Sequence, residues 1–484
     1  MTTAGTGATA VALAASEGPS DAQRATGPRD GAGGRGGGGA GGAGRASAGG
    51  GITAARVATA AVLADVRAGE LLDPVFDRRT AGLDPRDRRW ARELVWGMLR
   101  RRAWLDAILG DRVRGGLARL DPDLADLLRL GVHQLLYMGS VPAYAGIAQT
   151  VELAKRRHGI GASKLANAVL RRVDRDRDDL QVSLPSDPVE SLATRHSHPA
   201  WLVRRWVDRF GAKDAEELLL ANNREAAVYA RPWGVDTDEL ELSLRNAGVE
   251  THRSPHLTSG LRLERITSLT ELGAFRQGQF FMQDPAATLV TEYAALPSGA
   301  LVADMCAAPG GKALELARTA RMVVASDRSE NRVGRIAENA GRLGAGNVFP
   351  VVADAREPVV SMADGVLLDV PCTGTGTFRR HPDARWRIRI SDLAVLGALQ
   401  RELLVAAAQV VRSGGYLVYS TCSLEPEENE VQVNRFLGEN PEWRLEPPQD
   451  GVVPAELLDG GLLRVLPQRH GVDGAFAARL RRHG

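Results

Sequence analysis

Two of the three cysteines in this chain follow short apolar runs, in positions where a thiol could do chemistry. Cys372 comes directly after Asp369–Pro371, and Cys422 comes directly after Tyr419–Thr421. A single free cysteine is usually a small buried apolar residue. Two that end neighbouring strands of one sheet, beside a glycine turn, favour a reactive role, because a thiolate is a strong nucleophile. The pattern predicts covalent catalysis by a cysteine.

Methylation of carbon 5 of cytosine is one reaction that needs such a thiol. This carbon is a poor nucleophile until a thiolate adds at carbon 6 and gives the ring enamine character. A carboxyl group that protonates or hydrogen-bonds ring nitrogen 3 would help the addition, and Asp369 lies three positions before Cys372. After methyl transfer a base removes the proton on carbon 5 and the thiolate leaves, a step that the second cysteine could assist. The residues alone do not rank Cys372 and Cys422.

A turn of small residues follows the predicted strand Ala300–Asp304 and precedes a predicted helix over Ala313–Thr319. Glycines in such a turn let backbone N–H groups approach a ligand at the start of a helix. The turn lacks the full dinucleotide fingerprint, which argues against a nicotinamide or flavin enzyme. Lys312 could also orient the reaction centre. The predicted cofactor turn consists of Cys306, Ala307, Ala308, Pro309, Gly310, Gly311 and Lys312.

Two aspartates that end later strands also suit a cofactor. Asp327 stands 23 positions after Asp304, close to the spacing at which an acidic side chain hydrogen-bonds ribose hydroxyls in a doubly wound sheet. Asp354 ends the next strand and could accept from the amino group of an adenine, although a strand-terminal Asp is as often a helix cap or turn residue. Together they predict a ligand that carries a ribose and an adenine.

A target base must leave its stack to meet both a thiol and a methyl donor, and this costs less in a loop than in a duplex. Looped RNA is therefore the expected substrate. Arg379, Arg380 and Arg385 follow the first cysteine motif, with Trp386 beside them. These side chains could bind phosphates and stack a base, so we predict RNA contacts there. The alternative is a solvated basic loop.

The segment from residue 286 onward alternates apolar runs with helical patterns, which is typical of a doubly wound parallel sheet. Ligands of such sheets lie at the carboxyl ends of the strands, where all the motifs above fall. The sequence predicts an α/β, Rossmann-like domain over residues 286–484. Its predicted strands are Ala300–Asp304, Met322–Asp327, Val348–Asp354, Val366–Asp369 and Tyr416–Ser420.

Three further segments precede this domain. Of the first 50 residues 29 are Gly or Ala, without apolar periodicity, so residues 1–52 are predicted to be a disordered tail. Residues 53–180 carry apolar stripes at helical spacing, one of them opened by Asp121 and Pro122, and are predicted to form an all-helical domain. A linker with two prolines then leads to a small α+β unit over residues 190–285.

Several polar residues near the reaction centre have simple structural interpretations. Ser391 is predicted to cap a helix that ends at Gly414–Gly415, and Asp284 to open another helix at Pro285. Three acids after Cys422 most simply stabilise the first turn of a helix through its dipole, and we assign them no chemistry. These acids are Glu427, Glu428 and Glu430.

Composition narrows the class of protein. Lys and Arg number 61 against 59 Asp and Glu, a formal net charge of +2, so RNA must be held by local basic patches rather than by a global field. The three cysteines form no close pair of metal-ligand or disulfide spacing, which predicts a reducing compartment and no metal site. The sequence has no apolar run of membrane-spanning length and no secretion signal. We expect a soluble, cytoplasmic, monomeric protein.

These residues resemble the Sun-type family of RNA cytosine-5 methyltransferases, and within it the bacterial enzymes for small-subunit ribosomal RNA. The resemblance runs through three motifs in the order and spacing of the family, Asp304–Lys312, Asp369–Pro382 and Tyr419–Glu430. Segments Arg88–Arg101 and Leu128–Arg172 are similar to the NusB-type RNA-binding domain that such enzymes carry. The resemblance covers nearly the whole chain beyond the predicted tail.

Departures from the family pattern are small. Val370 and Thr373 stand where the family commonly has alanine and serine, and neither change removes a reactive group. Segment Tyr229–Trp233 is less similar to the strand that the family has there, so the RNA contacts expected of the small α+β unit do not carry over directly.

The resemblance implies a role for each reactive residue. Cys422, in the Thr-Cys motif, is the nucleophile, and Cys372, in the Pro-Cys motif, assists release of the methylated RNA. DNA cytosine methyltransferases attack with the Pro-Cys cysteine, so the second motif separates the RNA interpretation from the DNA one. The implied cofactor is S-adenosyl-L-methionine. Its implied binding residues are the turn Cys306–Lys312 with Asp327, Asp354 and Asp369.

Two rival functions stay open at this level. A same-class rival methylates transfer RNA, and the NusB-like domain favours ribosomal RNA by analogy alone. A different-class rival is a non-catalytic RNA-binding or assembly factor built on an inactive methyltransferase fold. Both cysteines, Asp369 and Lys312 are present, which argues against that rival, because a relic loses its reactive groups first.

Overall fold

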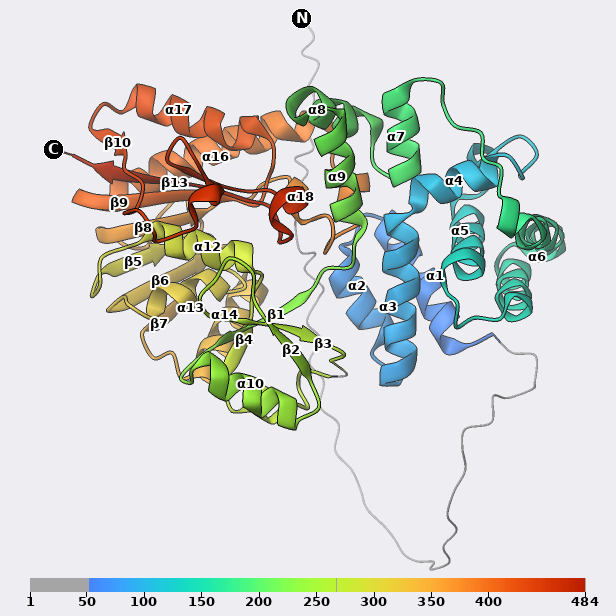
Figure 1. Ribbon diagram of the computed structural model, residues 1–484, viewed down its shortest axis with the longest axis horizontal. Helices are drawn as coiled ribbons and strands as arrows, with labels where there is room; N and C mark the ends of the chain where they lie inside the picture. Colours follow the sequence, from blue (N-terminus) through green and yellow to red (C-terminus); the bar gives the residue numbers. More distant parts are fainter. Residues whose placement is uncertain (1–51, 267, 484) are drawn as a thin grey trace, which may run out of the picture. The chain divides into compact units, whose positions relative to one another are not determined.

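The computed structural model describes residues 52–266 and 268–483. The predicted tail, residues 1–52, lies outside the described residues except for its last position. The described chain begins with an all-helical domain, as the sequence predicts (Figure 1). Its helices are α1 (Ala54–Arg67), α2 (Leu72–Thr80), α3 (Pro85–Arg100), α4 (Arg102–Gly110), α5 (Pro122–Tyr137) and α6 (Ala143–Asp176).

The helices of this domain begin at good capping residues and approach one another closely. The Asp121 carboxylate accepts from Asp123 N at 2.8 Å and caps α5, with Pro122 in the first helical position. Helices α3 and α5 meet at Gly97, where a Cβ atom would lie 2.4 Å from His133 Nε2. Burial lowers the pKa of His133 to about 3, so this imidazole is a neutral group of the core.

Three helices follow the predicted linker, namely α7 (Pro188–His196), α8 (Ala200–Phe210) and α9 (Ala212–Asn223). The Asp187 carboxylate accepts from Glu190 N at 2.8 Å and caps α7. Trp206 of α8 is buried in a cluster that also contains Phe378 and Leu424 of the C-terminal domain. These helices therefore share a core with the C-terminal domain.

Four strands of the described chain form a small antiparallel sheet in the order β2-β3-β1-β4. Segment Tyr229–Trp233, which fits the family pattern less well, contributes most of the internal strand β1. Arg231 on β1 pairs with Glu315 of the C-terminal domain at 2.7 Å, and both side chains are buried. The elements are β1 (Val228–Pro232), α10 (Thr237–Asn246), β2 (Glu250–Arg253), β3 (Leu261–Glu264), α11 (Gly273–Arg276) and β4 (Phe280–Met282).

The described part of the C-terminal domain is a sheet in the order β11-β12-β13-β9-β8-β5-β6-β7, with β10 beside β13. Strands β5 to β9 are parallel, and β13 is antiparallel to β9. The strands are β5 (Leu301–Asp304), β6 (Met322–Asp327), β7 (Val348–Val352), β8 (Ala363–Asp369), β9 (Val411–Thr421), β10 (Trp443–Leu445), β11 (Leu458–Asp459), β12 (Leu462–Val465) and β13 (Ala475–Arg482). The helices are α12 (Pro285–Ala294), α13 (Gly311–Ala317), α14 (Glu330–Leu343), α15 (Ala384–Arg387), α16 (Ile390–Val410), α17 (Glu430–Glu439) and α18 (Pro467–His470). The predicted α/β, Rossmann-like class is confirmed.

The order of the strands reverses between β5 and β8. Strand β5 pairs with β6 on one side and with β8 on the other, so the connections that leave β5 and β8 diverge and open a crevice at their carboxyl ends. Ligands of open α/β sheets bind at such a point. Asp304 ends β5 and Asp369 ends β8. The residues predicted to do chemistry therefore surround this crevice.

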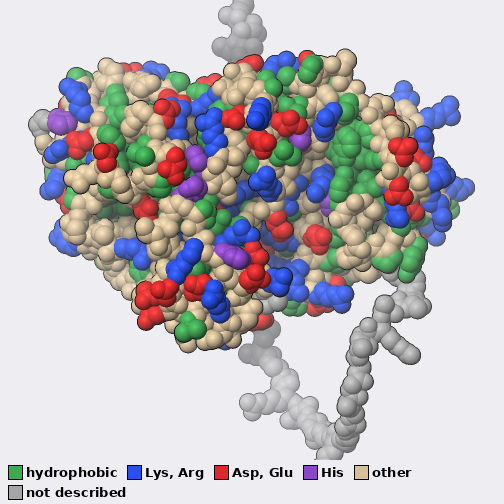
Figure 2. Space-filling model, viewed as in Figure 1, with side chains coloured by type: hydrophobic (Ala, Val, Ile, Leu, Met, Phe, Trp, Pro, Cys, Tyr) green, Lys and Arg blue, Asp and Glu red, His purple; other side chains and the backbone are tan. Residues whose placement is uncertain are grey.

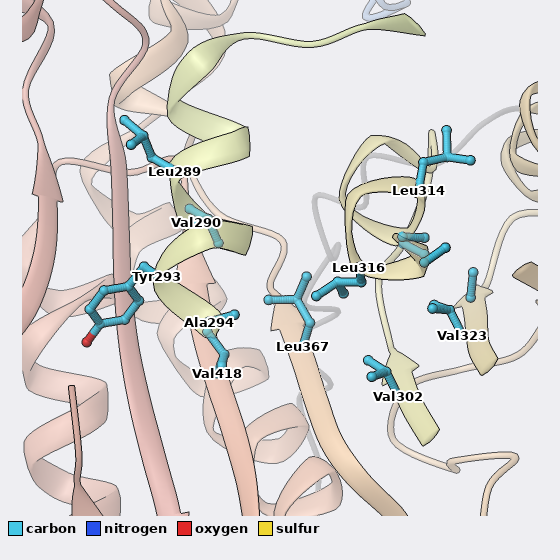
Figure 3. Packing of buried hydrophobic residues seen from close by; sticks show 14 of the residues in the cluster. Leu289, Val290, Tyr293, Ala294, Val302, Leu314, Leu316, Val323, Leu367 and Val418 are labelled. Carbon is cyan, nitrogen blue, oxygen red and sulfur yellow. The ribbon is translucent and has the colours of Figure 1, made fainter. Parts of the chain in front are cut away.

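Alternate residues of the central strands face opposite layers of the core. Leu367 of β8 and Val418 of β9 pack on the same face as Tyr293 of α12 and Leu314 of α13 (Figure 3). Leu368 belongs to a second cluster, which contains side chains of α16 and α17. Burial on both faces explains why the central strands read as continuous apolar runs.

Helix α16 alone among the described helices is long and apolar enough to cross a membrane by length and composition. Its Leu403 and Leu404 are buried in the core beneath the sheet, so α16 is a core helix. Ser391 does not cap it, contrary to the prediction. The helix begins at Ile390, so Ser391 lies inside its first turn, and the Asp392 carboxylate accepts from Arg389 N at 2.8 Å.

The predicted end of α16 is also wrong. The helix ends at Val410, and β9 begins with the next residue, so Gly414–Gly415 lies inside the strand. The glycines serve an irregular stretch of β9 rather than a helix cap. A Cβ atom on Gly415 would lie 2.8 Å from the Asp364 carbonyl oxygen, so a side chain there would push the two strands apart.

Replacing Gly97 by alanine tests the close approach of α3 and α5. The added Cβ atom would overlap His133, and overpacking of this kind costs about 1–3 kcal/mol. We expect Gly97→Ala to lower the thermal unfolding midpoint measured by circular dichroism. The matched control is Gly110→Ala, at a helical glycine with nothing within 4 Å, which should be neutral or stabilising because alanine favours a helix. Equal midpoints for the two variants would contradict the packing.

Candidate active site

The two strand-end cysteines lie against each other. Strands β8 and β9 are parallel neighbours with Asp369 paired opposite Ser420, so the residues that follow both strands emerge side by side. Cys372 Sγ lies 3.4 Å from Cys422 Sγ. The hydrogen bond to Cys422, together with burial, raises the pKa of Cys372 well above its usual range. Cys372 is therefore a neutral thiol.

Glu428 holds the loop that carries Cys372. Its buried carboxylate accepts from Thr373 N at 2.9 Å and also from the Thr373 hydroxyl. Gln400 of α16 donates to Glu428 at 3.1 Å and to Pro371 O at 3.0 Å. Burial raises the pKa of Glu428. The predicted role in a helix dipole is wrong for Glu428, because the side chain binds the cysteine loop instead.

The acids on either side of Glu428 pair with arginines of α8. Arg205 donates to Glu425 at 2.9 Å and to Glu427 at 2.7 Å, and Arg209 donates to Glu430 at 3.1 Å. Glu430 also starts α17, as the dipole interpretation requires. Helix α8 therefore holds the segment that follows the second cysteine motif.

The loop of Cys422 is fixed by its own hydrogen bonds. Thr421 Oγ1 donates to Asn429 Oδ1 at 2.6 Å, and Asn429 Nδ2 donates to Ser423 O at 2.9 Å. Gly376 N donates to Cys422 O at 2.9 Å. A Cβ atom on Gly376 would lie 2.7 Å from that oxygen, so only glycine lets the two cysteine loops approach this closely.

Lys312 and Asp369 form an ion pair beside the two thiols. Lys312 Nζ lies 2.8 Å from Asp369 Oδ2, and Ser420 Oγ donates to Asp369 Oδ1 at 2.8 Å. Burial alone would lower the pKa of Lys312, but the Asp369 carboxylate outweighs burial and raises this pKa, so the side chain is an ammonium. The side chains are 19% and 29% exposed, which leaves both within reach of a ligand.

Asp304 is buried behind this pair. Neither of its carboxylate oxygens has a hydrogen-bond partner in the described chain, and its exposed fraction is 0%. Burial raises the pKa of Asp304 to about 8, with a further contribution from Asp369. A buried carboxyl group without partners is costly, and it suits a site that receives a cationic or hydrogen-bonding ligand.

A cavity of about 250 Å³ adjoins these residues. Asp304 and Asp369 line it, together with Gln283. The turn that borders the cavity depends on its glycines: Gly310 has a φ of +103°, and a Cβ atom on Gly311 would lie 2.9 Å from Gln283. The predicted turn also contributes to the wall through Cys306, Ala307, Ala308, Pro309, Gly311 and Lys312.

The remaining predicted cofactor residues lie outside the cavity wall. Asp327 is buried at the end of β6 and pairs with Arg332 at 3.1 Å. Asp354 follows β7, and hydrogen bonds from Arg356 lower its pKa. Burial also raises the pKa of the thiol of the turn residue Cys306, which differs from the other two cysteines in that the sulphur–sulphur contact of the described chain joins Cys372 to Cys422.

The arginines predicted to bind RNA are engaged with protein groups. Arg379 and Arg380 both pair with Asp284 and Asp473, and the Arg379 side chain is only 8% exposed. Arg385 is fully buried, and its guanidinium donates to four protein oxygens. Burial lowers the pKa of Arg385 to about 9. In this arrangement Arg385 is not available to a phosphate, and the other two are already paired.

The face drawn in Figure 2 has no single large basic patch. Figure 2 shows Lys and Arg side chains intermixed with Asp and Glu over this face. This distribution agrees with the formal net charge of +2 and with the prediction that any basic patches are local.

Sequence reasoning missed Asp304 and Glu428 as residues of the site. A signal for Asp304 was present, because it ends strand β5 at the point where the sheet order reverses, next to strand β8, which Asp369 ends. No comparable signal marked Glu428, which stands among other acids just before a helix. Its contact with the Thr373 loop arises from tertiary packing alone.

Comparisons with known proteins agree with this geometry. The family model described as 16S rRNA methyltransferase RsmB/F matches residues 295–481, and the NusB family model matches residues 53–175. The model of the ferredoxin-like domain of RsmF/B-like methyltransferases matches residues 198–270. A probable ribosomal RNA small subunit methyltransferase B from Synechocystis is 36% identical over 442 residues, which are 87% of this chain and 98% of that protein. The chain belongs to the RsmB/F family.

Two further relatives support membership of the RsmB/F family. The ribosomal RNA small subunit methyltransferase B of Vibrio cholerae is 35% identical over 427 residues, which are 85% of this chain and 97% of that protein. The crystal structure of PH0851 superimposes with a TM-score of 0.74 at 27% identity, covering 89% of this chain and 99% of that one. The predicted methyltransferase class is confirmed, while the roles of single residues stay predictions.

Thiol-specific oxidation tests the distance between the two sulphur atoms. Diamide takes up two electrons and two protons when it joins two thiols, and it acts only where they can touch. We expect brief treatment to link Cys372 to Cys422, detected as one cross-linked peptide by mass spectrometry. The Cys306→Ser variant should form the same link. Independent alkylation of all three thiols after diamide treatment would contradict the geometry.

The raised pKa of Asp304 predicts a pH-dependent stability. Between about pH 4, its unfolded pKa, and about pH 8 the folded protein binds a proton that the unfolded chain has lost. Stability therefore falls as pH rises, by up to about 1.4 kcal/mol per pH unit. Asp304→Asn should flatten this decline in denaturant melts without a methyl donor. Asp354→Asn is the control, because its lowered pKa acts only below about pH 4. Parallel curves for wild type and Asp304→Asn would exclude this ionisation.

Proposed function

We propose that this protein methylates carbon 5 of a cytosine in 16S ribosomal RNA, through a covalent adduct between Cys422 and carbon 6 of the base. The observation that carries the proposal is the pair of thiols 3.4 Å apart beside the Lys312–Asp369 ion pair, at the crevice of an RsmB/F-family sheet. A thiol, an acid and a second thiol in contact are the groups that this reaction needs.

Attack is the task of Cys422 and of the groups around Asp369. Cys422 adds to carbon 6 as a thiolate, while Asp369 holds a proton or a hydrogen bond at ring nitrogen 3. Ser420 and Lys312 fix the orientation of the Asp369 carboxyl group, and the Lys312 ammonium is a proton source 2.8 Å away. A general acid in this position stabilises the electron-rich ring of the adduct.

Release is the task in which Cys372 assists. Once the methyl group is in place, a base takes the proton from carbon 5 and the bond between carbon 6 and Cys422 breaks. The neutral Cys372 thiol then hydrogen-bonds the departing thiolate, because its sulphur atom lies within reach of Cys422 Sγ. A hydrogen bond to a charged sulphur stabilises the leaving group.

The proposed cofactor is S-adenosyl-L-methionine, which when bound supplies an electrophilic methyl group. The glycine turn Cys306–Lys312 would hold it through backbone N–H groups, and Asp327 and Asp354 would receive its ribose and adenine. The orphaned carboxyl group of Asp304 lines the same cavity and suits the cationic end of such a molecule. Asp369 borders both the cavity and the thiols, so it would contact cofactor and base together.

The proposed partner is small-subunit ribosomal RNA, because relatives that match this chain over almost their whole length are named as its methyltransferases. The chain would act as a monomer in the cytoplasm, where ribosomal RNA is assembled. Its target cytosine must be unstacked to enter the crevice, which favours a loop or an unassembled region of the RNA.

Methylation of transcribed RNAs tests the proposed function. Full-length protein is incubated with S-adenosyl-L-methionine labelled in its methyl group and with 16S ribosomal RNA or transfer RNA made by transcription. We expect label on one cytosine of 16S RNA, recovered as 5-methylcytidine after digestion. Label on transfer RNA alone would favour the same-class rival. Label on uridine, or on no RNA, would refute the proposal.

The two cysteines should have separable phenotypes. Cys422→Ala removes the nucleophile and should abolish methylation. Cys372→Ala leaves attack intact and slows release, so we expect a covalent protein–RNA adduct that survives denaturing electrophoresis. Cys306→Ala should accumulate no adduct, because the sulphur–sulphur contact joins Cys372 to Cys422. The opposite pattern, with an adduct in Cys422→Ala, would reverse the role assignment.

A further inference from the structure

Side chains of the helical domain hold the main chain that follows Cys372. Trp96 Nε1 of α3 donates to Arg380 O at 3.1 Å, and Arg100 Nη2 of the same helix donates to Arg379 O at 3.1 Å. In the reverse direction Trp386 Nε1 donates to Leu99 O at 3.0 Å. Helix α3 is therefore joined to a segment about 280 positions away by three hydrogen bonds.

An ion pair at the edge of this contact adds a fourth link. His381 Nδ1 lies 3.1 Å from Asp73 Oδ2 of α2. Asp73 is also 4.0 Å from Arg92. The Trp96 side chain, by contrast, is only 3% exposed and stacks edge-on against Phe76. The buried Trp96 hydrogen bond is thus the inner part of the contact and the His381 pair its outer part.

The held segment is rigidly connected to both cysteines. Arg380 N and His381 N both donate to Thr377 O, at 2.9 Å and 3.1 Å, so the chain from Gly374 to His381 is a continuous set of tight turns. Within it Gly376 N donates to Cys422 O at 2.9 Å. A shift of the Arg380 carbonyl group would therefore also displace the loop that carries Cys372.

The other side of the same segment is anchored in the C-terminal domain. The guanidinium groups of Arg379 and Arg380 pair with Asp284 and Asp473. Their side chains are thus engaged with the C-terminal domain, while their carbonyl groups accept the hydrogen bonds from α3. Arg100 reaches the Arg379 carbonyl group from α3, and burial lowers its pKa to about 10.

We propose that Trp96 and Arg100 are positioning residues, through which the helical domain holds the Cys372 thiol against Cys422 and so sets the rate of product release. The inference rests on the proposed function only for the identity of the affected step, which is release of the methylated RNA. Attack depends less on α3, because the hydrogen bonds between α3 and the C-terminal domain in the described chain go to the segment after Cys372 and not to the Cys422 loop, which Asn429 and the arginines of α8 support. Loss of the α3 contact should therefore slow release more than attack.

The decisive comparison is between two Trp→Phe variants of the same domain. Trp96→Phe keeps an aromatic ring but removes the donor to Arg380 O. Trp104→Phe removes a donor that bonds Tyr137 OH at 2.9 Å, within the helical domain. One neutral hydrogen bond corresponds to about a fivefold change in an equilibrium between held and released loops. We expect adduct decay to be slower by up to about fivefold in Trp96→Phe and unchanged in Trp104→Phe.

The readouts separate positioning from a general loss of structure. Single-turnover reactions with labelled donor and 16S RNA give the rate of adduct formation and the rate of its decay, and thermal melts report folding. Slower decay with unchanged formation and KM for RNA supports the proposal. Equal decay in both variants overturns it, as does a parallel loss of formation and decay that follows a lower melting temperature.

A second measurement needs no methylation. Diamide should link Cys372 to Cys422 more slowly in Trp96→Phe than in Trp104→Phe, because the loop spends less time with the sulphur atoms in contact. A slower link in a protein that fails to methylate any RNA would sustain the positioning role and refute the proposed function alone. Identical linking rates would overturn the positioning role whatever the protein methylates.

Discussion

Parallel pairing of β8 with β9, in a register that sets Asp369 opposite Ser420, is the constraint on which the candidate site depends. Both strands end at one edge of the sheet, so the residues after them must share a small space, and the two thiols meet there. A slip of one residue would turn Asp369 to the other face of the sheet and break its contact with Lys312. The irregular stretch at Gly414–Gly415 lies at the far end of β9, which leaves the register near the thiols undisturbed.

The sheet brings the cysteine loops together, but it does not hold them beyond the last strand residues. Buried polar groups from elsewhere do so, with Glu428 bound to the first loop and Asn429 to the second. An unpaired polar group in a dry interior is costly, so such networks favour one arrangement and penalise partial ones. Asp304 departs from this arrangement, since neither oxygen of its carboxyl group has a hydrogen-bond partner in the described chain and the group lines the cavity. The unpaired carboxyl group thus lies where a ligand can hydrogen-bond it.

Local patterns predict the architecture and the meeting of Cys372 with Cys422, because apolar runs and the rule for reversing strand order need no long-range information. Prediction fails where the role of a side chain depends on which residue it contacts in the folded protein. Arg385 looks like a basic surface residue in sequence, and only the packing of α7 to α9 against its loop buries it. Glu428 has the same difficulty, because a glutamate before a helix is ordinary. A Gly-Gly pair reads as a helix stop, yet at Gly414–Gly415 the strand has already begun.

Strand β13 comes late in the chain but lies in the interior of the sheet, between β12 and β9. Gly474, directly before it, donates to Gly376 O at 2.8 Å and so joins the loop of the first cysteine. During synthesis the helical domain can fold from contacts near in sequence, while the large sheet waits for residues close to Arg482 to leave the ribosome. The loop of the first cysteine therefore gains its hydrogen bond from Gly474 only after the chain beyond β9 has been made.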